Sequence, residues 1–228
     1  ETPAKEVTVY VTISNDGVPI RGRDGTVLCH KAITVPYFDL GRYNLDEYYR
    51  YHTENGEGKY IDENIVERPT GLHLYLYLLE RYFIGLPEEQ CCKGAYPRDA
   101  LASFKLCEDV CYMDETPAYT ADSFAALTIT GSPTSLYMAN FWGHDENLMY
   151  YRNHCFPYMS PGWGSTSDYI VLSDGDTWDV AMFTNWSFWS SGGAFTCFDK
   201  DAYNARPGME MTISSQAYGT TFEGSDFY

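Results

Sequence analysis

The chain of 228 residues is long enough to bury the core of one large domain. Thirty-two acidic residues against fifteen basic ones give a net charge of -17, which repels nucleic acid and anionic lipid head groups and excludes both as partners. The longest apolar stretch, residues 72–86, is interrupted by His73, Glu80 and Arg81. It is therefore no candidate for a membrane span, and we expect a soluble chain.

The amino-acid composition also indicates where the protein is located. Twenty-one Tyr, twelve Phe and five Trp make the chain rich in aromatic residues, whereas Lys is scarce. Tyr offers a large contact area at low entropy cost, which suits extracellular contacts. The polar start at Glu1 is typical of a short linker left after processing, so we expect an extracellular or cell-surface location.

The seven cysteines are too few for a disulfide scaffold, and their odd number leaves at least one unpaired within a monomer. Cys107 and Cys111 are four residues apart and are the candidates for a disulfide, whereas the adjacent Cys91 and Cys92 would form a strained ring. Buried thiols without a role remain the alternative for each cysteine.

The first predicted element is a half-buried strand over residues 7–14, where apolar and polar residues alternate. The turn signal Asn15-Asp16-Gly17 and a second β-rich run over residues 26–35 predict a hairpin. A short helix over residues 44–51 is then expected, with Asn44 as its cap, and a polar loop follows at residues 55–58.

The clearest helix is predicted over residues 70–85. Thr70 is its expected N-cap, and Leu-Pro at 86 and 87 is the expected stop. Apolar residues recur at helical spacing at Leu72, Leu76, Leu79 and Phe83. The helix is expected to cross one face of a sheet.

Residues 88–123 contain four cysteines and weak periodicity, so we expect an insertion that lies on the surface. Six further strands are predicted, at residues 126–130, 136–142, 169–172, 177–184, 194–198 and 209–215. The fold class is therefore α+β, a mixed sheet with one main helix packed across it, a cysteine-bearing insertion and extra C-terminal strands.

Few patterns predict chemistry. His144, Asp145 and His154 offer nitrogen and oxygen ligands, but a solvated loop is the preferred interpretation, and Asp174-Gly175-Asp176 indicates a tight hairpin turn instead of a calcium loop. Cys155 lies beside His154 without an orienting group, and no nucleophile elbow or phosphate loop occurs. We therefore expect no enzyme activity, no cofactor and no metal.

The strongest cluster is aromatic. Exposed Trp and Tyr rings beside Asp and Asn are what a sugar-binding platform needs. The candidate platform consists of Trp142, Tyr150, Tyr151, Trp163, Trp186 and Trp189. Rings that belong to the core or to an interface are the alternative.

Three segments carry a resemblance to a known family: Ser-Leu-Tyr-Met-Ala-Asn at 135–140, Gly-Trp-Gly at 162–164, and Asp-Tyr-Ile-Val-Leu-Ser-Asp-Gly-Asp-Thr-Trp-Asp-Val at 168–180. The sequence there resembles the transcobalamin-like carboxy-terminal domain family. The resemblance implies a ubiquitin-like β-grasp sheet and an origin in exported Gram-positive surface proteins, and it assigns no ligand residues here.

We predict one domain over residues 1–206, and over residues 207–228 a C-terminal strand or the start of an immunoglobulin-like domain. The preferred function is a non-catalytic surface module, structural or adhesive, that assembles with copies of itself or with other surface proteins, through a terminal strand added to a neighbour's sheet edge. A carbohydrate- or small-ligand-binding module and an enzyme of unknown type are the alternatives.

Overall fold

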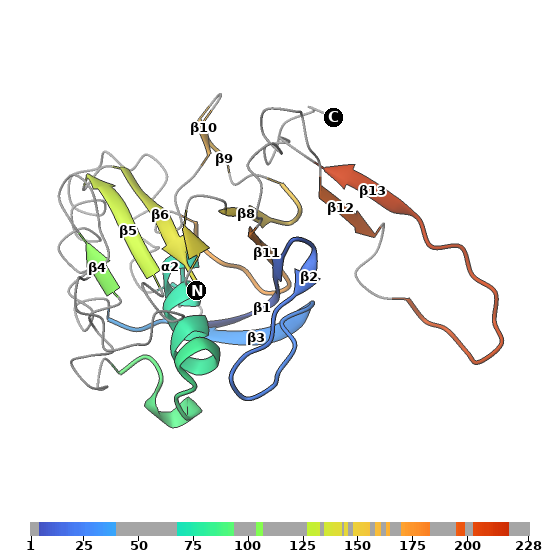
Figure 1. The fold of residues 1–228 in the computed structure, drawn as a ribbon, viewed down its shortest axis with the longest axis horizontal. Coiled ribbons are helices and arrows are strands. Elements are labelled where there is room, and N and C mark those ends of the chain that lie inside the picture. Colours follow the sequence, from blue (N-terminus) through green and yellow to red (C-terminus); the bar gives the residue numbers. More distant parts are fainter. Residues whose placement is uncertain are drawn as a thin grey trace.

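The structure is a computed structural model, and it describes residues 5–39, 68–93, 104–106, 127–132, 135–142, 144–145, 148–155, 158–160, 163–164, 170–182, 195–198 and 203–218. These residues form a five-stranded mixed sheet, a four-stranded sheet, two two-stranded ribbons and one main helix (Figure 1). The α+β class predicted from the sequence is confirmed. The predicted helix over residues 44–51 lies outside the described residues.

The five-stranded sheet is built on β1 (Glu6–Asn15), which confirms the first predicted strand. Its odd-numbered residues from Val7 to Ile13 are buried, because alternate side chains of a strand point to opposite faces. Asp16 and Gly17 take the positive φ angles predicted for the turn that follows.

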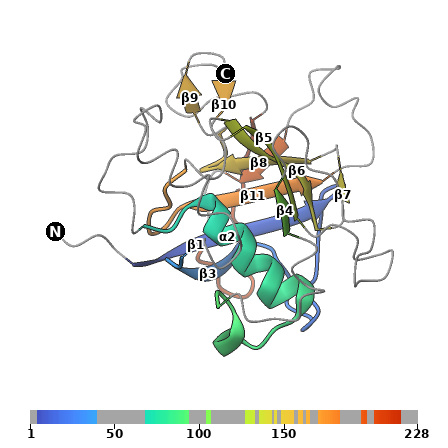
Figure 2. The same ribbon diagram turned by 90° about the vertical axis from the view of Figure 1, so that its left-hand side faces the viewer.

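The other strands are arranged around β1 (Figures 1 and 2). It pairs antiparallel with β2 (Val18–Pro19) and with β3 (Lys31–Pro36) on one side, and parallel with β11 (Thr177–Met182) on the other. The outer partner of β11 is β8 (Leu148–Arg152), which lies between Asp145 and His154, where the sequence predicts a solvated loop. The second predicted run, 26–35, forms a ladder only from Lys31 onward.

The predicted helix is confirmed over nearly its full length. It consists of α2 (Gly71–Leu78), which continues as the π-helical η3 (Leu79–Ile84). The expected stop at Leu86 and Pro87 is corrected to Gly85, whose left-handed φ of 86° lets its N–H bond the Glu80 carbonyl oxygen at 3.1 Å. No helix among the described residues has the length and apolar character to cross a bilayer.

Every residue of α2 is buried, so the helix has no solvent face in the described structure. The helix lies between two sheets, and the ring of Tyr75 contacts both of them. Its ring centroid lies 5.7 Å from that of Trp178 in β11 and 5.0 Å from that of Phe141 at the end of β6. Figure 2 shows the helix crossing the strands of the five-stranded sheet.

The N-terminus of α2 is fixed by His73. Its Nδ1 accepts the Thr70 backbone N–H at 3.2 Å, and its Nε2 lies 3.0 Å from the Phe38 carbonyl oxygen. Since a carbonyl oxygen only accepts, the ring proton is on Nε2, and His73 performs the role that Glu or Gln has in a capping box. Burial lowers the pKa of His73 from 6.5 to about 4, so the ring is neutral at pH 7.

A second sheet contains β4 (Phe104–Leu106), β5 (Leu127–Ser132), β6 (Ser135–Phe141) and β7 (His144–Asp145) in that order. The strands predicted at 126–130 and 136–142 are thereby confirmed. Of the expected surface insertion over residues 88–123, the structure describes residues 88–93 and 104–106, where Glu88–Gln90 and Lys93 are exposed. The segment contains the 3-10 turn η4 (Glu88–Gln90) and strand β4, and Cys91 and Cys92 are buried against the core.

The predictions of strands at residues 169–172 and 209–215 are wrong, because neither segment forms the expected ladder among the described strands. Ile170–Leu172 makes only one bridge, between Val171 and Thr70, and Met209–Ser214 has no ladder partner among the described residues. Pairing instead begins at β13 (Ser215–Tyr218), which binds β12 (Phe195–Phe198) antiparallel across the predicted boundary at residue 206. A small ribbon joins β9 (Tyr158–Ser160) and β10 (Trp163–Gly164).

Candidate interaction site

The described rings of the predicted sugar platform pack against or within the core. Tyr151 has no exposed surface. Tyr150 is half-buried, and its ring stacks at 5.8 Å on that of the fully buried Trp178. Trp142 is half-buried beside Phe83, at 5.2 Å between ring centroids.

This placement favours the alternative that these rings belong to the core. A stacking platform needs ring faces open to solvent, and Tyr151 presents none. The ring of Trp163 and all of Trp186 and Trp189 lie outside the described residues, as do the disulfide candidates Cys107 and Cys111.

The tip of β8 is a two-residue hairpin turn. Asn153 and His154 both have positive φ, and Arg152 and Cys155 exchange two backbone hydrogen bonds across it. The turn brings His154 Nδ1 to 3.0 Å from Asp179 Oδ2 in β11, and both side chains are partly exposed. Within the described part of the chain, no three His, Cys, Asp or Glu side chains gather as a metal site requires.

The Asp174-Gly175-Asp176 segment forms a tight turn that docks on β1 instead of closing a hairpin. Thr8 N–H donates to the Asp174 carboxylate at 2.7 Å, and Gly175 N–H donates to the Thr8 carbonyl oxygen at 2.9 Å. The Tyr10 N–H donates to the Asp176 carbonyl oxygen at 2.8 Å. The turn therefore covers the part of the β1 edge that β11 leaves unpaired.

Replacing Asp176 by alanine is expected to lower the free energy of unfolding by about 2 to 3 kcal/mol, because its buried carboxylate accepts two hydrogen bonds that would be lost. The donors are Ser173 N–H at 2.9 Å and Asn153 Nδ2 at 3.0 Å. Urea denaturation measures the change. Asp174→Ala, at an exposed carboxylate of the same turn, is the matched control and should cost about 1 kcal/mol; equal losses would contradict the prediction.

Cys91 is a buried thiol, one of the two alternatives that the sequence allows for each cysteine. Its Sγ donates to the Pro87 carbonyl oxygen at 3.5 Å. Burial, with the nearby Glu80 carboxylate, raises the pKa of Cys91 to about 12. The side chain is therefore a neutral thiol at pH 7 and no nucleophile.

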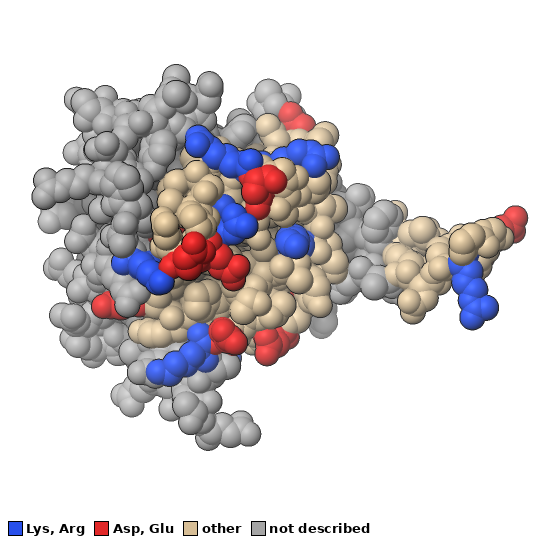
Figure 3. Space-filling view, turned by 90° about the horizontal axis from the view of Figure 1, so that it is seen from below, with Lys and Arg blue, Asp and Glu red and all other residues tan. Residues whose placement is uncertain are grey.

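Among the described residues, two exposed large apolar side chains lie on a projecting arm, residues 203–214. Met209 and Ile213 are 53% and 50% exposed. A Pro207-Gly208 turn, closed by a hydrogen bond from Met209 N–H to the Arg206 carbonyl oxygen at 3.0 Å, forms its tip. Figure 1 shows the arm extending away from the two sheets, and Figure 3 shows it protruding from the described surface.

The alternation of apolar and polar residues in this arm predicts a strand, and Met209–Ser214 has no ladder partner among the described residues. Comparisons of the chain with protein-family models, curated proteins and solved structures found no match. Membership of the transcobalamin-like family therefore stays a prediction from sequence.

Proposed function

We propose that the protein is an extracellular module that assembles with copies of itself, and that the projecting arm contributes a strand to a neighbour. The observation that carries the proposal is the segment Met209–Ser214. It is largely exposed and belongs to no ladder among the described residues. A segment that pairs with no described strand of its own chain is available for addition to a sheet edge of another chain.

The side-chain pattern of the arm supports this role. Met209, Met211 and Ile213 alternate with Glu210, Thr212 and Ser214, which is the pattern of a strand with one buried and one solvated face. Met209 and Ile213 are 53% and 50% exposed, so completing their burial against a neighbour contributes about 1 kcal/mol each. Backbone hydrogen bonds to the neighbour's edge add to that gain.

The proposed module is β-grasp-like. Strands β1 and β11 are parallel neighbours, and α2 lies between them in sequence and packs on their sheet. A helix that connects parallel strands and covers one face is the arrangement that a β-grasp sheet shares with other α+β folds. The aromatic-rich, acidic composition supports the extracellular location.

The double variant Met209→Ser with Ile213→Ser tests the function, because it removes the apolar face of the arm and leaves its backbone intact. We expect light scattering after size exclusion to show a molar mass that rises with concentration for the unmodified chain and stays at one chain for the variant. Thr212→Ser, on the opposite face, is the matched control and should assemble normally. A single-chain mass for the unmodified protein at every concentration would refute the proposal.

A further inference from the structure

The outer edge of β3 has backbone groups that point away from its own sheet. In an antiparallel strand, each residue directs its backbone N–H and C=O to the same neighbouring strand. Successive residues alternate between the two sides. In β1, the N–H groups of Thr8 and Tyr10 point to the Asp174–Asp176 turn. The backbone N–H and C=O groups of the neighbouring odd-numbered residues therefore point to β3. Thr34 and Ala32, which lie opposite Thr8 and Tyr10, therefore direct their N–H and C=O outward.

These outward groups are accessible. Ala32 and Thr34 are exposed, and no hydrogen bond from another described residue reaches their backbone N–H or C=O groups. The other end of the sheet differs, because in β8 Tyr151 is buried and Tyr150 is half-buried. The edge of β1 beyond β11 is covered by the Asp174–Asp176 turn. Of the two longer edge strands described in this sheet, β3 thus offers the more accessible edge, and the two-residue β2 is too short to pair with a six-residue strand.

We propose that the arm segment Met209–Ser214 of one copy adds as a strand to the outer edge of β3 in a second copy. This inference rests on the proposed function and names its acceptor. The donor and β3 (Lys31–Pro36) have the same length of six residues. Two outward residues on β3 provide four backbone hydrogen bonds, the core of a short two-stranded ladder.

Apolar and polar side chains alternate in both the arm and β3, and the two patterns can be aligned. Ile33 and Val35 of β3 point to the core face, and Ala32 and Thr34 to the opposite face. When Thr212 lies beside Thr34, the apolar set of the arm falls on the side of Ile33 and Val35. The polar set then continues the outer face, where the hydroxyls of Thr8 and Thr34 are 3.2 Å apart.

Copies with a net charge of -17 repel each other, so the pairing depends on apolar burial and backbone hydrogen bonds and should strengthen as salt screens the charges. Figure 3 shows Lys and Arg interspersed with Asp and Glu over the described part of the face it presents. Pro36 has no N–H and limits the ladder at the other end of β3.

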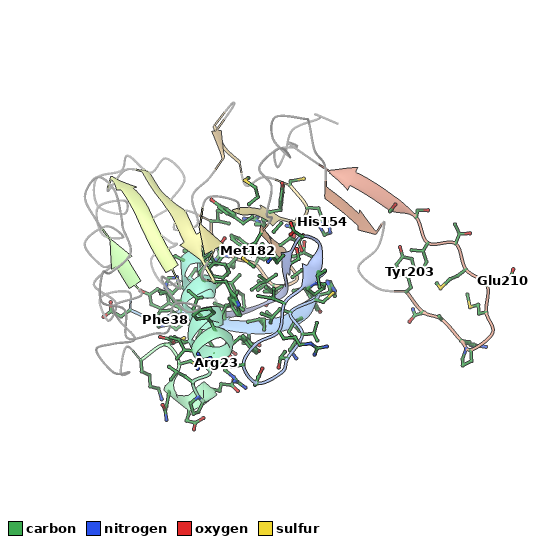
Figure 4. All side chains as sticks on the ribbon, viewed as in Figure 1. Arg23, Phe38, His154, Met182, Tyr203 and Glu210 are labelled. Carbon is green, nitrogen blue, oxygen red and sulfur yellow. The ribbon has the colours of Figure 1, made fainter. Side chains whose placement is uncertain are left out.

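The geometry favours a second copy over the chain's own edge. Figure 4 shows Glu210 at the outer end of the arm, directed away from the body that contains β3. Donor and acceptor are different surfaces of one chain, so each copy that donates its arm still offers its own β3. Such a heterologous contact adds copies without limit and produces a filament, unless the rotation closes a ring.

Thr34→Pro tests the acceptor. Its N–H points outward, so proline removes a donor that the monomer does not use, and an edge strand tolerates it. We expect Thr34→Pro to stay a folded single chain, with circular dichroism unchanged, under conditions where the unmodified protein assembles. Thr34→Val keeps the N–H and the strand preference and should assemble like the unmodified protein.

Amide hydrogen exchange on the unmodified protein gives a second measurement that needs no variant. Assembly should slow exchange at Ala32 and Thr34 by at least about tenfold, because both amides gain hydrogen bonds. Unchanged exchange there, together with normal assembly of Thr34→Pro, overturns the assignment of β3. If the arm variant still blocks assembly in that case, the proposed function stands and only the acceptor is wrong.

Discussion

Replacing Trp178 by alanine is expected to lower the free energy of unfolding by about 4 kcal/mol, the typical loss for a large buried aromatic side chain. Trp178 is fully buried in β11. Its ring contacts those of Tyr75 in α2 and Tyr150 in β8, so the substitution leaves a cavity between the helix and the sheet. Urea denaturation, followed by far-ultraviolet circular dichroism, measures the loss.

The variant Trp178→Phe separates the free-energy cost of the cavity from that of the lost hydrogen bond. The indole Nε1–H donates to the Tyr75 hydroxyl at 3.2 Å, and phenylalanine removes this donor while it keeps most of the packing. We expect Trp178→Phe to cost about 2 kcal/mol and Tyr75→Phe about 1 kcal/mol. If Trp178→Ala cost no more than Tyr75→Phe, the ring would not be a central part of the core.

The elements that could be predicted from the sequence are those whose pattern of apolar residues lies within one segment. The strict alternation from Val7 to Ile13 and the helical spacing of Leu72 and Leu76 each reflect one buried face, and the structure has β1 and α2 there. Leu-Pro at 86 and 87 predicts a helix end that is slightly too late. The left-handed Gly85 ends the helix first.

The elements that were missed depend on contacts between distant residues. The parallel pairing of Val11 with Trp178 leaves no mark on either sequence segment alone. The strand β8 is short, and its turn at Asn153 and His154 lacks the glycine that marks most two-residue hairpins. The capping role of His73 was missed because His is not among the usual residues at that position.

The candidate site was predictable only in part. The composition predicted interaction through aromatic residues, but Tyr151 lies in the core, which sequence cannot distinguish from an exposed platform. Alternation from Met209 to Ile213 predicted a strand, and the structure pairs only from Ser215 onward. Only the structure shows that this segment has no ladder partner among the described residues and that Thr34 presents its backbone outward.

Acidification from pH 6.5 to pH 4 is expected to destabilise the fold by about 3 kcal/mol through His73 alone. Burial depresses the pKa of His73 from 6.5 to about 4. Below pH 6.5 the unfolded chain binds a proton at this residue, whereas the folded chain does not until about pH 4. The contribution is therefore fully present above pH 6.5 and is lost as the pH falls toward 4, at about 1.4 kcal/mol per pH unit.

His73→Gln isolates this contribution from that of the carboxylates. A glutamine amide accepts from Thr70 N–H through its oxygen and donates to the Phe38 carbonyl oxygen through its nitrogen, so it preserves both hydrogen bonds of the ring without titrating. Urea denaturation at a series of pH values should show a shallower fall for this variant than for the unmodified chain. His30→Gln, at an exposed histidine, is the matched control and should keep the steep fall. Parallel curves for the unmodified chain and His73→Gln would mean that His73 is protonated as readily in the fold as in the unfolded chain. Its Nδ1 would then not accept the Thr70 N–H as the geometry requires.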